Sequence, residues 1–262
     1  MSEVSTITAG AFCWPELSTT DQKGAVAFYR SLFGWALEDA PMGPGETYSM
    51  FKVRGKNVGG AYTMRNDERA MGAPPHWNSY VAVANVDEST KKAKSLGAKV
   101  LAEPLDVMEA GRMSVLQDPT GAAICLWQAK LQPGAQVLGE TGSLVWTELA
   151  TRDPKAAEKF YSSLFGWTMK PSTNPNMQYT EIYNQGAGQG GILPITPEMG
   201  NMPPAWTPYF GVDDVDKTAA KAKESGGKVY MGPQDIPNVG RFAVLGDPQG
   251  APFCVFKGAV AH

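Results

Sequence analysis

Two glutamates occupy matching positions in the sequence and are the side chains best suited to acid–base chemistry. Glu16 stands two residues after Trp14, and Glu148 stands two residues after Trp146, 132 positions further along the chain. Residues two apart on a strand point to the same face of a sheet, so each glutamate shares a face with its tryptophan. Burial on a partly apolar face raises the pKa of a carboxyl group toward the range of a general base. Both glutamates are therefore candidate catalytic residues, although a glutamate paired with an arginine or with backbone N–H groups is the more common arrangement.

Aromatic and basic side chains supply candidates for ligand binding. A Trp-x-x-Tyr segment begins at Trp77 in the first half and at Trp206 in the second, and it combines stacking surface with polar tips. Arg112 and Arg241 each follow a glycine at the start of a predicted strand. A guanidinium group there either clamps an anionic ligand or is paired within the protein. The predicted ligand-binding residues are Trp14, Asn78, Tyr80, Arg112, Trp146, Thr207, Tyr209 and Arg241.

The cysteines and histidines are weaker candidates for a functional site. Cys13, Cys125 and Cys254 are odd in number and widely spaced, which favours reduced thiols over a disulfide framework. No histidine repeats beside Cys125 or Cys254, so we interpret both as buried small hydrophobic residues rather than nucleophiles. His76 has no counterpart in the second half, where Ala205 stands, and we interpret it as a loop residue before a strand.

The matching positions belong to a long internal repeat. FYRSLFGW at residues 28–35 returns as FYSSLFGW at 160–167, and DPTGA at 118–122 returns as DPQGA at 247–251. A glycine pair at 59–60 returns at 190–191. A period of about 130 residues is too long for a solenoid and predicts two tandem domains, residues 8–129 and 142–258.

Each half is predicted to contain the same order of elements twice. A strand at 12–17 is followed by N-cap candidates at 18–21, by apolar residues at helical spacing, and by Gly34 as a C-cap. Strands at 48–53 and 58–64 complete a first unit, and a second unit begins with a strand at 79–83. The pattern predicts an α+β fold of tandem paired βαβββ modules, each half forming a curved, incomplete barrel.

Composition narrows the class of protein. The 262 residues carry a net charge of −3 and 43% hydrophobic residues, which suits a globular protein and gives no basic surface for nucleic acid. No apolar run is long enough to cross a bilayer, and residues 1–13 do not resemble a signal peptide. We expect a cytoplasmic monomer or homodimer whose partner is a small molecule, with no binding to nucleic acid or membranes.

These motifs resemble the vicinal oxygen chelate superfamily, which includes glyoxalase I, extradiol dioxygenases and bleomycin-resistance proteins. The resemblance rests on the FYRSLFGW segment, on Val86-Asp87 at a helix start and on the DPTG turn, all found twice. More closely, the chain looks like two-domain glyoxalase-like members from bacteria. The resemblance implies that each half curls around a concave face that holds a ligand or a metal ion.

The resemblance also implies where metal ligands would stand. Metal-dependent members carry His or Glu on the first strand, on the strand before the second helix, and four residues after the glycine of the DPxG turn. The corresponding residues here are Trp14, Asn78 and Cys125 in the first half and Trp146, Thr207 and Cys254 in the second. Such residues are poor ligands for a divalent ion, so we expect no resident metal and no other cofactor.

Three functions are compatible with the sequence. The first is a metal-free protein that binds a small organic molecule, elongated or aromatic, with an anionic or carbonyl group. The second is a degenerate or metal-independent glyoxalase-like lyase or hydroxylase that uses Glu16 or Glu148 as a base. The third is a protein whose barrels are simply filled by side chains.

Overall fold

The computed structural model describes residues 7–43, 45–70, 72–172 and 178–259. The first half contains β1 (Phe12–Thr19), α1 (Gln22–Phe33), β2 (Ala36–Gly43), β3 (Glu46–Val53), β4 (Lys56–Thr63), α2 (Asn66–Ala70), β5 (His76–Ala82), α3 (Val86–Ser95), β6 (Lys99–Val107), β7 (Gly111–Gln117) and β8 (Ala123–Ala129). The second half contains β9 (Leu144–Thr151), α4 (Pro154–Phe165), β10 (Thr168–Pro171), β11 (Thr180–Asn184), β12 (Ala187–Pro194), the short helix η1 (Pro197–Met199), β13 (Ala205–Gly211), α5 (Val215–Glu224), β14 (Lys228–Ile236), β15 (Gly240–Gly246) and β16 (Pro252–Gly258).

Each half forms one curled sheet of eight strands. The strand order is β2-β3-β4-β1-β5-β8-β7-β6 in the first half and β10-β11-β12-β9-β13-β16-β15-β14 in the second. The strands β1 and β5 pair antiparallel at the centre of the first sheet, and each has a parallel neighbour on its other side. The predicted α+β fold of paired βαβββ modules in tandem is therefore confirmed. Among the described residues, no helix is long and apolar enough to cross a membrane.

Local sequence signals set the ends of the long helices. The Asp21 side chain accepts a hydrogen bond from the backbone N–H of Gly24 at the start of α1, and Asp153 caps α4 in the same way. Gly34 ends α1 with a left-handed backbone at φ 71°, a conformation that costs glycine little. The helix boundaries thus follow from short motifs that occur in both halves.

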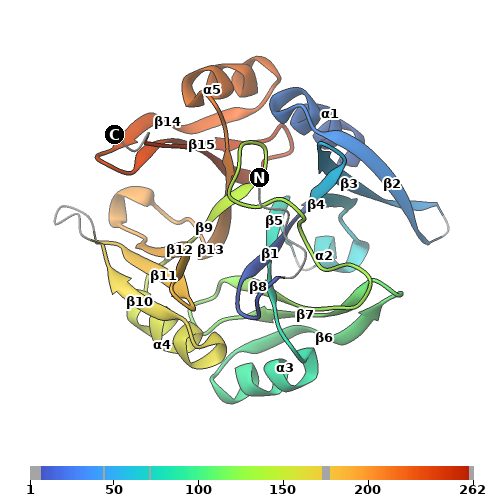
Figure 1. Cartoon of the computed structure of the whole chain (residues 1–262), viewed down its shortest axis with the longest axis vertical. Helices are drawn as coiled ribbons and strands as arrows, with labels where there is room; N and C mark the ends of the chain where they lie inside the picture. Colours follow the sequence, from blue (N-terminus) through green and yellow to red (C-terminus); the bar gives the residue numbers. More distant parts are fainter. Residues whose placement is uncertain (1–6, 44, 71, 173–177, 260–262) are drawn as a thin grey trace.

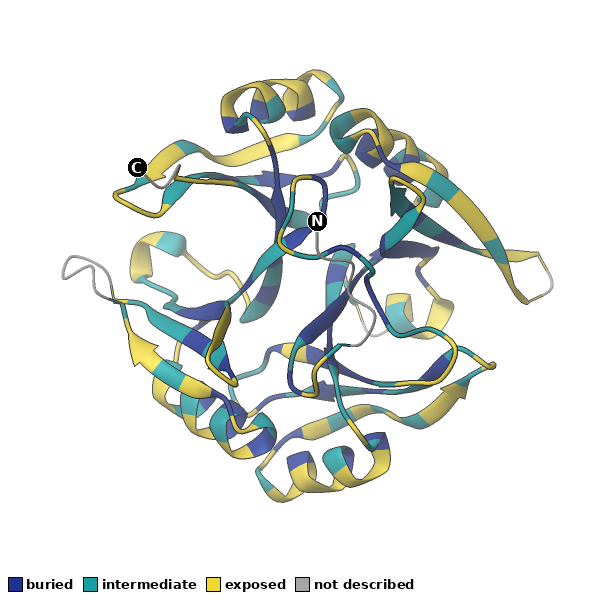
Figure 2. Cartoon of the chain, viewed as in Figure 1, coloured by how far each residue is buried: buried dark blue, intermediate teal, exposed yellow. Residues whose placement is uncertain are grey.

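The two largest hydrophobic cores are shared between the halves. One core combines α1 and the strands around it with α5 and the sheet of the second half, and the other combines α3 with α4. Figure 1 shows α1 beside α5 and α3 beside α4, and Figure 2 shows the exposed faces of these helices turned outward. The predicted domain ranges, 8–129 and 142–258, each contain one whole sheet, but neither contains a whole core.

The repeated FYxSLFGW motif forms the centre of these shared cores. The Tyr29 hydroxyl donates to Oδ2 of Asp247 in the other half at 3.2 Å and accepts from the indole of Trp77 at 2.9 Å. Tyr161 donates to Asp118 at 2.7 Å and accepts from Trp206 at 2.8 Å. The motif therefore joins one half of the molecule to the DPxG turn of the other.

Candidate functional site

The face of each sheet away from its helices, here called the inner face, carries the candidate glutamates. Glu16 and Trp14 lie on β1 opposite Asn78 and Tyr80 of β5, as the register of the strands requires. Oε1 of Glu16 accepts a hydrogen bond from the Tyr48 hydroxyl at 2.9 Å, and Oε2 accepts from the Tyr80 hydroxyl at 2.8 Å. The indole N–H of Trp14 donates to the Tyr48 oxygen at 2.8 Å. These side chains form a continuous Trp–Tyr–Glu–Tyr arrangement.

The second half repeats this arrangement. Tyr209 donates to Oε1 of Glu148 at 2.9 Å, and Trp146 donates to the Tyr179 hydroxyl at 2.8 Å. Tyr179 also hydrogen-bonds Glu148. Thr207 is the register partner of Glu148, as Asn78 is of Glu16. The structure therefore brings together the predicted tryptophans, glutamates and tyrosines on one face of each sheet.

Burial dominates the electrostatics of both glutamates. Desolvation raises the pKa of Glu16 and of Glu148, and the hydrogen bonds from the tyrosines offset this only in part. In the part of the chain that the structure describes, neither carboxylate is paired with an arginine, and its hydrogen bonds come from side chains rather than from backbone N–H groups. Both side chains keep partial exposure. A partly accessible carboxyl group of this kind can accept a hydrogen bond or a proton from a ligand.

A pair of glycines makes room for this arrangement. A Cβ atom on Gly60 would lie 2.2 Å from the Tyr48 hydroxyl oxygen, and one on Gly191 would lie 2.0 Å from that of Tyr179. The preceding Gly59 brings β4 close to the backbone of Pro15, with a Cβ position 2.8 Å from the Pro15 carbonyl oxygen. The repeated Gly-Gly pair is thus required both by strand packing and by the tyrosine.

The two predicted arginines lie elsewhere. Arg112 contacts the carboxylate of Asp87, at the start of α3, through two hydrogen bonds of 2.8 and 2.9 Å. Arg241 binds Asp216 of α5 in the same way, at 2.7 and 2.8 Å. The neighbouring Met113 points to the inner face, where it contacts the Tyr80 hydroxyl. The arginine side chains therefore lie on the helix-covered face and are not brought together with the glutamates.

Cys125, Cys254 and His76 lie beside side chains that contact the two glutamates. Burial raises the pKa of Cys125 and of Cys254 well above the usual range, which leaves neutral thiols beside Tyr80 and Tyr209. His76 is the first residue of β5 rather than a loop residue. One ring nitrogen lies 3.1 Å from Oδ1 of Asn78. The side-chain amide N–H of Asn78 donates a hydrogen bond to Glu16. His76 thus extends the polar arrangement of the first half.

The inner face of the first half is partly filled. Trp14 is 8% exposed and packs with Tyr80, Cys125 and Trp127, and Ala135 of the segment between the sheets packs against them. Trp146 in the second half is more exposed. The two tryptophans therefore differ in the surface that they offer to a ligand.

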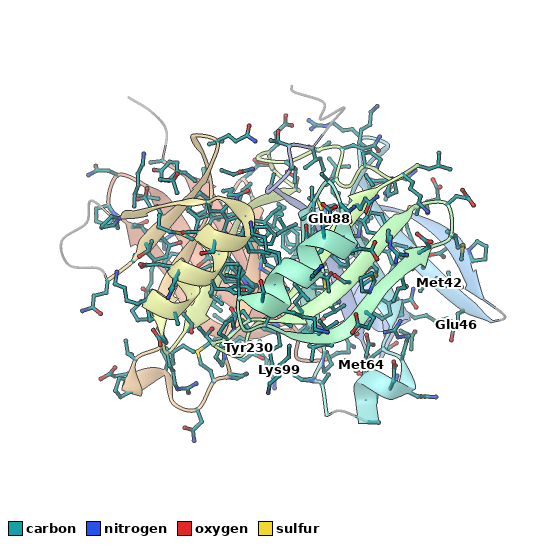
Figure 3. All side chains as sticks on the ribbon, turned by 90° about the horizontal axis from the view of Figure 1, so that it is seen from below. Met42, Glu46, Met64, Glu88, Lys99 and Tyr230 are labelled. Atoms are coloured by element: carbon teal, nitrogen blue, oxygen red, sulfur yellow. The ribbon has the colours of Figure 1, made fainter. Side chains whose placement is uncertain are left out.

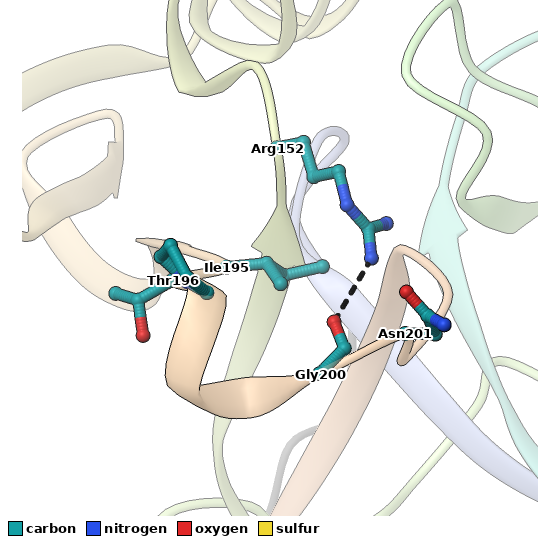
Figure 4. Close-up of a pocket in the computed structure, with 6 residues that line it drawn as sticks. Arg152, Ile195, Thr196, Gly200 and Asn201 are labelled. Atoms are coloured by element: carbon teal, nitrogen blue, oxygen red, sulfur yellow. Dashed lines mark hydrogen bonds between the residues drawn. The ribbon is translucent and has the colours of Figure 1, made fainter.

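Two cavities lie at equivalent places, where β1 and β9 end. The larger, about 720 Å³, runs from the start of α1 past the β2–β3 turn to α2, and Tyr62 and Arg65 line its wall. Figure 3 shows Met42 and Glu46 near that turn and Met64 close to α2; all three line this groove. The smaller, about 430 Å³, is lined by Arg152, whose guanidinium donates to the Gly200 carbonyl at 3.3 Å (Figure 4). Neither cavity is lined by Glu16 or Glu148.

Sequence reasoning missed three residues of this region. Tyr48 and Tyr179 match at an offset of 131 residues, the same offset as the Gly-Gly pair that follows them, so an alignment of the halves would have found them. Glu68 of α2 accepts a hydrogen bond from Tyr62 at 2.7 Å. It has no repeated signal, because the second half has η1 instead of α2.

The raised pKa of Glu148 predicts a pH-dependent effect of the substitution Glu148→Gln. A carboxyl group whose pKa is higher in the folded state contributes stability below its unfolded pKa and loses it as pH rises through the folded pKa. The free energy of unfolding of the parent should therefore fall, relative to Glu148→Gln, as pH rises above about 4.5. Urea unfolding of both proteins between pH 4.5 and 8 measures this difference, and a pH-independent difference would contradict the prediction. Glu16→Gln should follow the same direction.

Comparison with known proteins shows the family to which the chain belongs. The chain matches the model of the Glyoxalase/Bleomycin resistance protein/Dioxygenase superfamily over residues 12–126 and again over 143–255. The chain belongs to this superfamily. It is 45% identical over 248 residues to "Putative glyoxylase CFP32" of Mycobacterium tuberculosis, covering 94% of each chain. It is 34% identical to the anthracycline biosynthesis protein DnrV of Streptomyces peucetius, covering 95% of this chain and 93% of that one.

A solved glyoxalase structure shows a similar fold. The Mn(II)-bound glyoxalase from Novosphingobium aromaticivorans superposes with a TM-score of 0.66 at 16% identity, over 95% of this chain and 82% of that one. At this identity the likeness concerns the fold alone.

The residues at the superfamily's ligand positions do not fit a divalent metal ion. The indole N–H of Trp14 can only donate a hydrogen bond, and it already donates to the Tyr48 hydroxyl oxygen. The buried Cys125 thiol stays protonated. Within residues 7–43, 45–70, 72–172 and 178–259, no three His, Cys, Asp or Glu side chains are grouped closely enough to hold a metal ion.

Proposed function

We propose that the protein binds a small organic molecule, elongated or aromatic, at the inner face of its curled sheets, without a resident metal ion. The observation that carries this proposal is the Trp–Tyr–Glu–Tyr arrangement, which both halves build from the same four residue types and whose glutamate is partly exposed in each. Both glutamates are partly exposed on the face that carries the tryptophans, so each is able to contact a ligand there. The name of DnrV, an anthracycline biosynthesis protein, also favours an aromatic ligand.

Substitution of the tryptophans tests which half binds. In a screen of aromatic metabolites followed by tryptophan fluorescence, Trp14→Ala or Trp146→Ala should weaken binding by about 1–3 kcal/mol, by analogy with stacking of bases on aromatic side chains. Leu101→Ala, an exposed change on β6, is the control and should leave affinity unchanged. Parent affinity in both tryptophan variants, with their folds verified by circular dichroism, would remove the tryptophans from the site.

Metal content is a separate prediction. Protein purified without added metal should contain far less than one equivalent of zinc, nickel, manganese or iron, because the residues at the superfamily's ligand positions are poor donors. Elemental analysis of the purified protein measures this. About one tightly held metal ion per half would contradict the metal-free part of the proposal.

An enzyme that uses Glu16 or Glu148 as a base is the second candidate function. The raised pKa of a partly exposed carboxyl group favours it. Exchange of an acidic C–H proton of a bound compound with D₂O, followed by NMR, distinguishes the candidates. Exchange that requires Glu16 or Glu148 supports a lyase-type reaction, and binding without exchange supports a binding protein.

A further inference from the structure

A segment of the chain itself covers part of the inner face of the first half. Residues 130–138 follow β8, and within them Ala135, which is 1% exposed, packs against Trp14 and Trp127. The indole N–H of Trp127 donates a hydrogen bond to the carbonyl of Gln132 at 2.9 Å. In the first half, a peptide therefore lies on the aromatic surface where a ligand of the proposed kind would bind.

Backbone hydrogen bonds hold this peptide near the starts of β1 and β4. The Ala135 N–H donates to the carbonyl of Cys13 at 2.7 Å, and the Gln136 N–H donates to the carbonyl of Asn57 at 2.8 Å. The Asn57 N–H in turn donates to Oε1 of Gln136 at 2.9 Å. These groups are available because Cys13 lies at a bulge of β1, and because β1 pairs with β4 only from Glu16 onward.

The second half has the same backbone groups at equivalent places. Val145 corresponds to Cys13 and lies where the register of β9 with β13 shifts. Gly188 corresponds to Asn57, near the start of β12. Within the described residues, neither Val145 nor Gly188 makes a hydrogen bond to a group outside its sheet. The strands β9 and β12 pair only from Thr147 onward, so this pairing does not use the Val145 carbonyl or the backbone of Gly188.

The aromatic side chains next to these groups are more exposed than those of the first half. Trp14 and Trp127 are 8% and 9% exposed, whereas the corresponding Trp146 and Phe256 are only partly buried. A Cβ atom on Gly188 would lie 3.6 Å from the Trp146 ring, so the backbone of Gly188 lies beside this surface. The second half thus combines an accessible aromatic surface with backbone groups that no other segment of the described chain binds.

We propose that the inner face of the second half binds a short peptide through its backbone amide groups, as the first half binds residues 132–136. This inference rests on the proposed binding function and names the class of its elongated ligand. One N–H of the peptide donates to the Val145 carbonyl, and the next N–H donates to the Gly188 carbonyl. An amide oxygen in the side chain of that second residue accepts from the Gly188 N–H. Backbone hydrogen bonds of this kind supply affinity, while the side-chain surface supplies specificity.

Phe256 favours an aromatic residue in the peptide. Trp127 donates to a peptide carbonyl, but Phe256 has no N–H to donate, so a carbonyl buried there would stay unpaired. An aromatic side chain instead packs against Phe256 and Trp146. By the order of the contacts in the first half, this aromatic residue stands three positions before the residue that binds Val145.

The blocked hexapeptide Phe-Pro-Gly-Ala-Gln-Val tests the proposal. It copies residues 133–137 and has phenylalanine in place of Gln132. Binding to the full chain is followed at pH 7 by ¹⁵N–¹H NMR, in which the indole signals of Trp14 and Trp146 report on the two halves. The Trp146 signal should shift to saturation, and the Trp14 signal should stay unchanged because the chain's own segment already occupies that surface. The same peptide with an N-methylated alanine should bind about tenfold more weakly, since the Val145 carbonyl loses its donor.

A substitution at Gly188 provides an independent test. Gly188→Val places extra methyl groups beside Trp146 and Tyr183, on the surface where the peptide lies, and should weaken peptide binding by about tenfold or more. Gly232→Val on β14 is the matched control, because a Cβ atom there meets nothing within 4 Å, and it should leave the affinity unchanged. Circular dichroism verifies the fold of both variants.

Three results would overturn the proposal in the parent protein: no response of Trp146, a response of Trp14 in its place, or equal binding of the N-methylated peptide. Parent affinity in a folded Gly188→Val protein would overturn it as well. The proposed function fails separately, and only if no compound of the wider aromatic screen binds.

Discussion

Expressed separately, residues 1–141 and residues 142–262 should each fail to give a cooperatively folded monomer. Each half contains a whole sheet, but its helices pack against the other half. Without that half, Phe51 and Trp35 in the first core lose Phe210 and Phe253, and a large apolar surface meets water. Exposure of a buried aromatic side chain costs about 1.5–3 kcal/mol, so a few such residues exceed the stability of an ordinary domain.

Sedimentation and urea unfolding test this expectation. We expect each fragment to be unfolded or self-associated, and we expect the two fragments mixed together to recover one cooperative transition. Self-association is understandable because a half can offer its own modules to a second copy of itself. A monomeric fragment with a single cooperative transition would contradict the prediction, and it would show that residues 8–129 and 142–258 are independent domains.

The substitution Asp247→Ala should lower the free energy of unfolding by about 3–5 kcal/mol. Asp247 is fully buried, and its carboxylate accepts the Tyr29 hydroxyl and the backbone N–H groups of Gln249, Gly250 and Ala251. Its loss leaves several buried donors without a partner, each at a cost of about 1–3 kcal/mol. Asp118→Ala, at the equivalent turn, should have an effect of similar size.

Two further variants separate the contributions. Tyr29→Phe removes one hydrogen bond to Asp247 and one from Trp77, so its effect should be smaller than that of Asp247→Ala. Asp67→Ala, an exposed change on α2, should leave the free energy of unfolding unchanged. Urea unfolding at pH 7 measures all of these. An Asp247→Ala protein as stable as the parent would show that water replaces the lost contacts.

The fold was largely predictable because its signals are local and occur twice. The helix ends follow from Asp21 and Gly34, and the order of strands follows from two copies of one pattern. The strand β2 could not be predicted, because its sequence ALEDAPMG is mostly exposed and shows no alternation of apolar and polar residues. The short helix α2 has no buried residue and therefore no apolar periodicity.

The site was predictable only where the spacing of residues along one strand determines which side chains share a face of the sheet. Glu16 and Trp14 share a face because they are two residues apart, and register with β5 adds Tyr80. Arg112 pairs with Asp87 because β7 lies close to α3, and no local sequence pattern predicts that distance. DPTG was correctly interpreted as a turn, but the bond from Tyr161 to Asp118 joins residues 43 positions apart in different halves.

The shared cores have a consequence for synthesis of the chain on the ribosome. The first core contains Leu17 and Phe51 near one end of the chain and Phe253 and Val255 near the other. At ~5–20 residues per second, the early part of this core waits on the order of ten seconds or more for its partners. During that time the apolar face of α1 is uncovered and available to chaperones or to another nascent chain. Translation speed across the second half should therefore influence the yield of folded protein, even when the amino-acid sequence is unchanged.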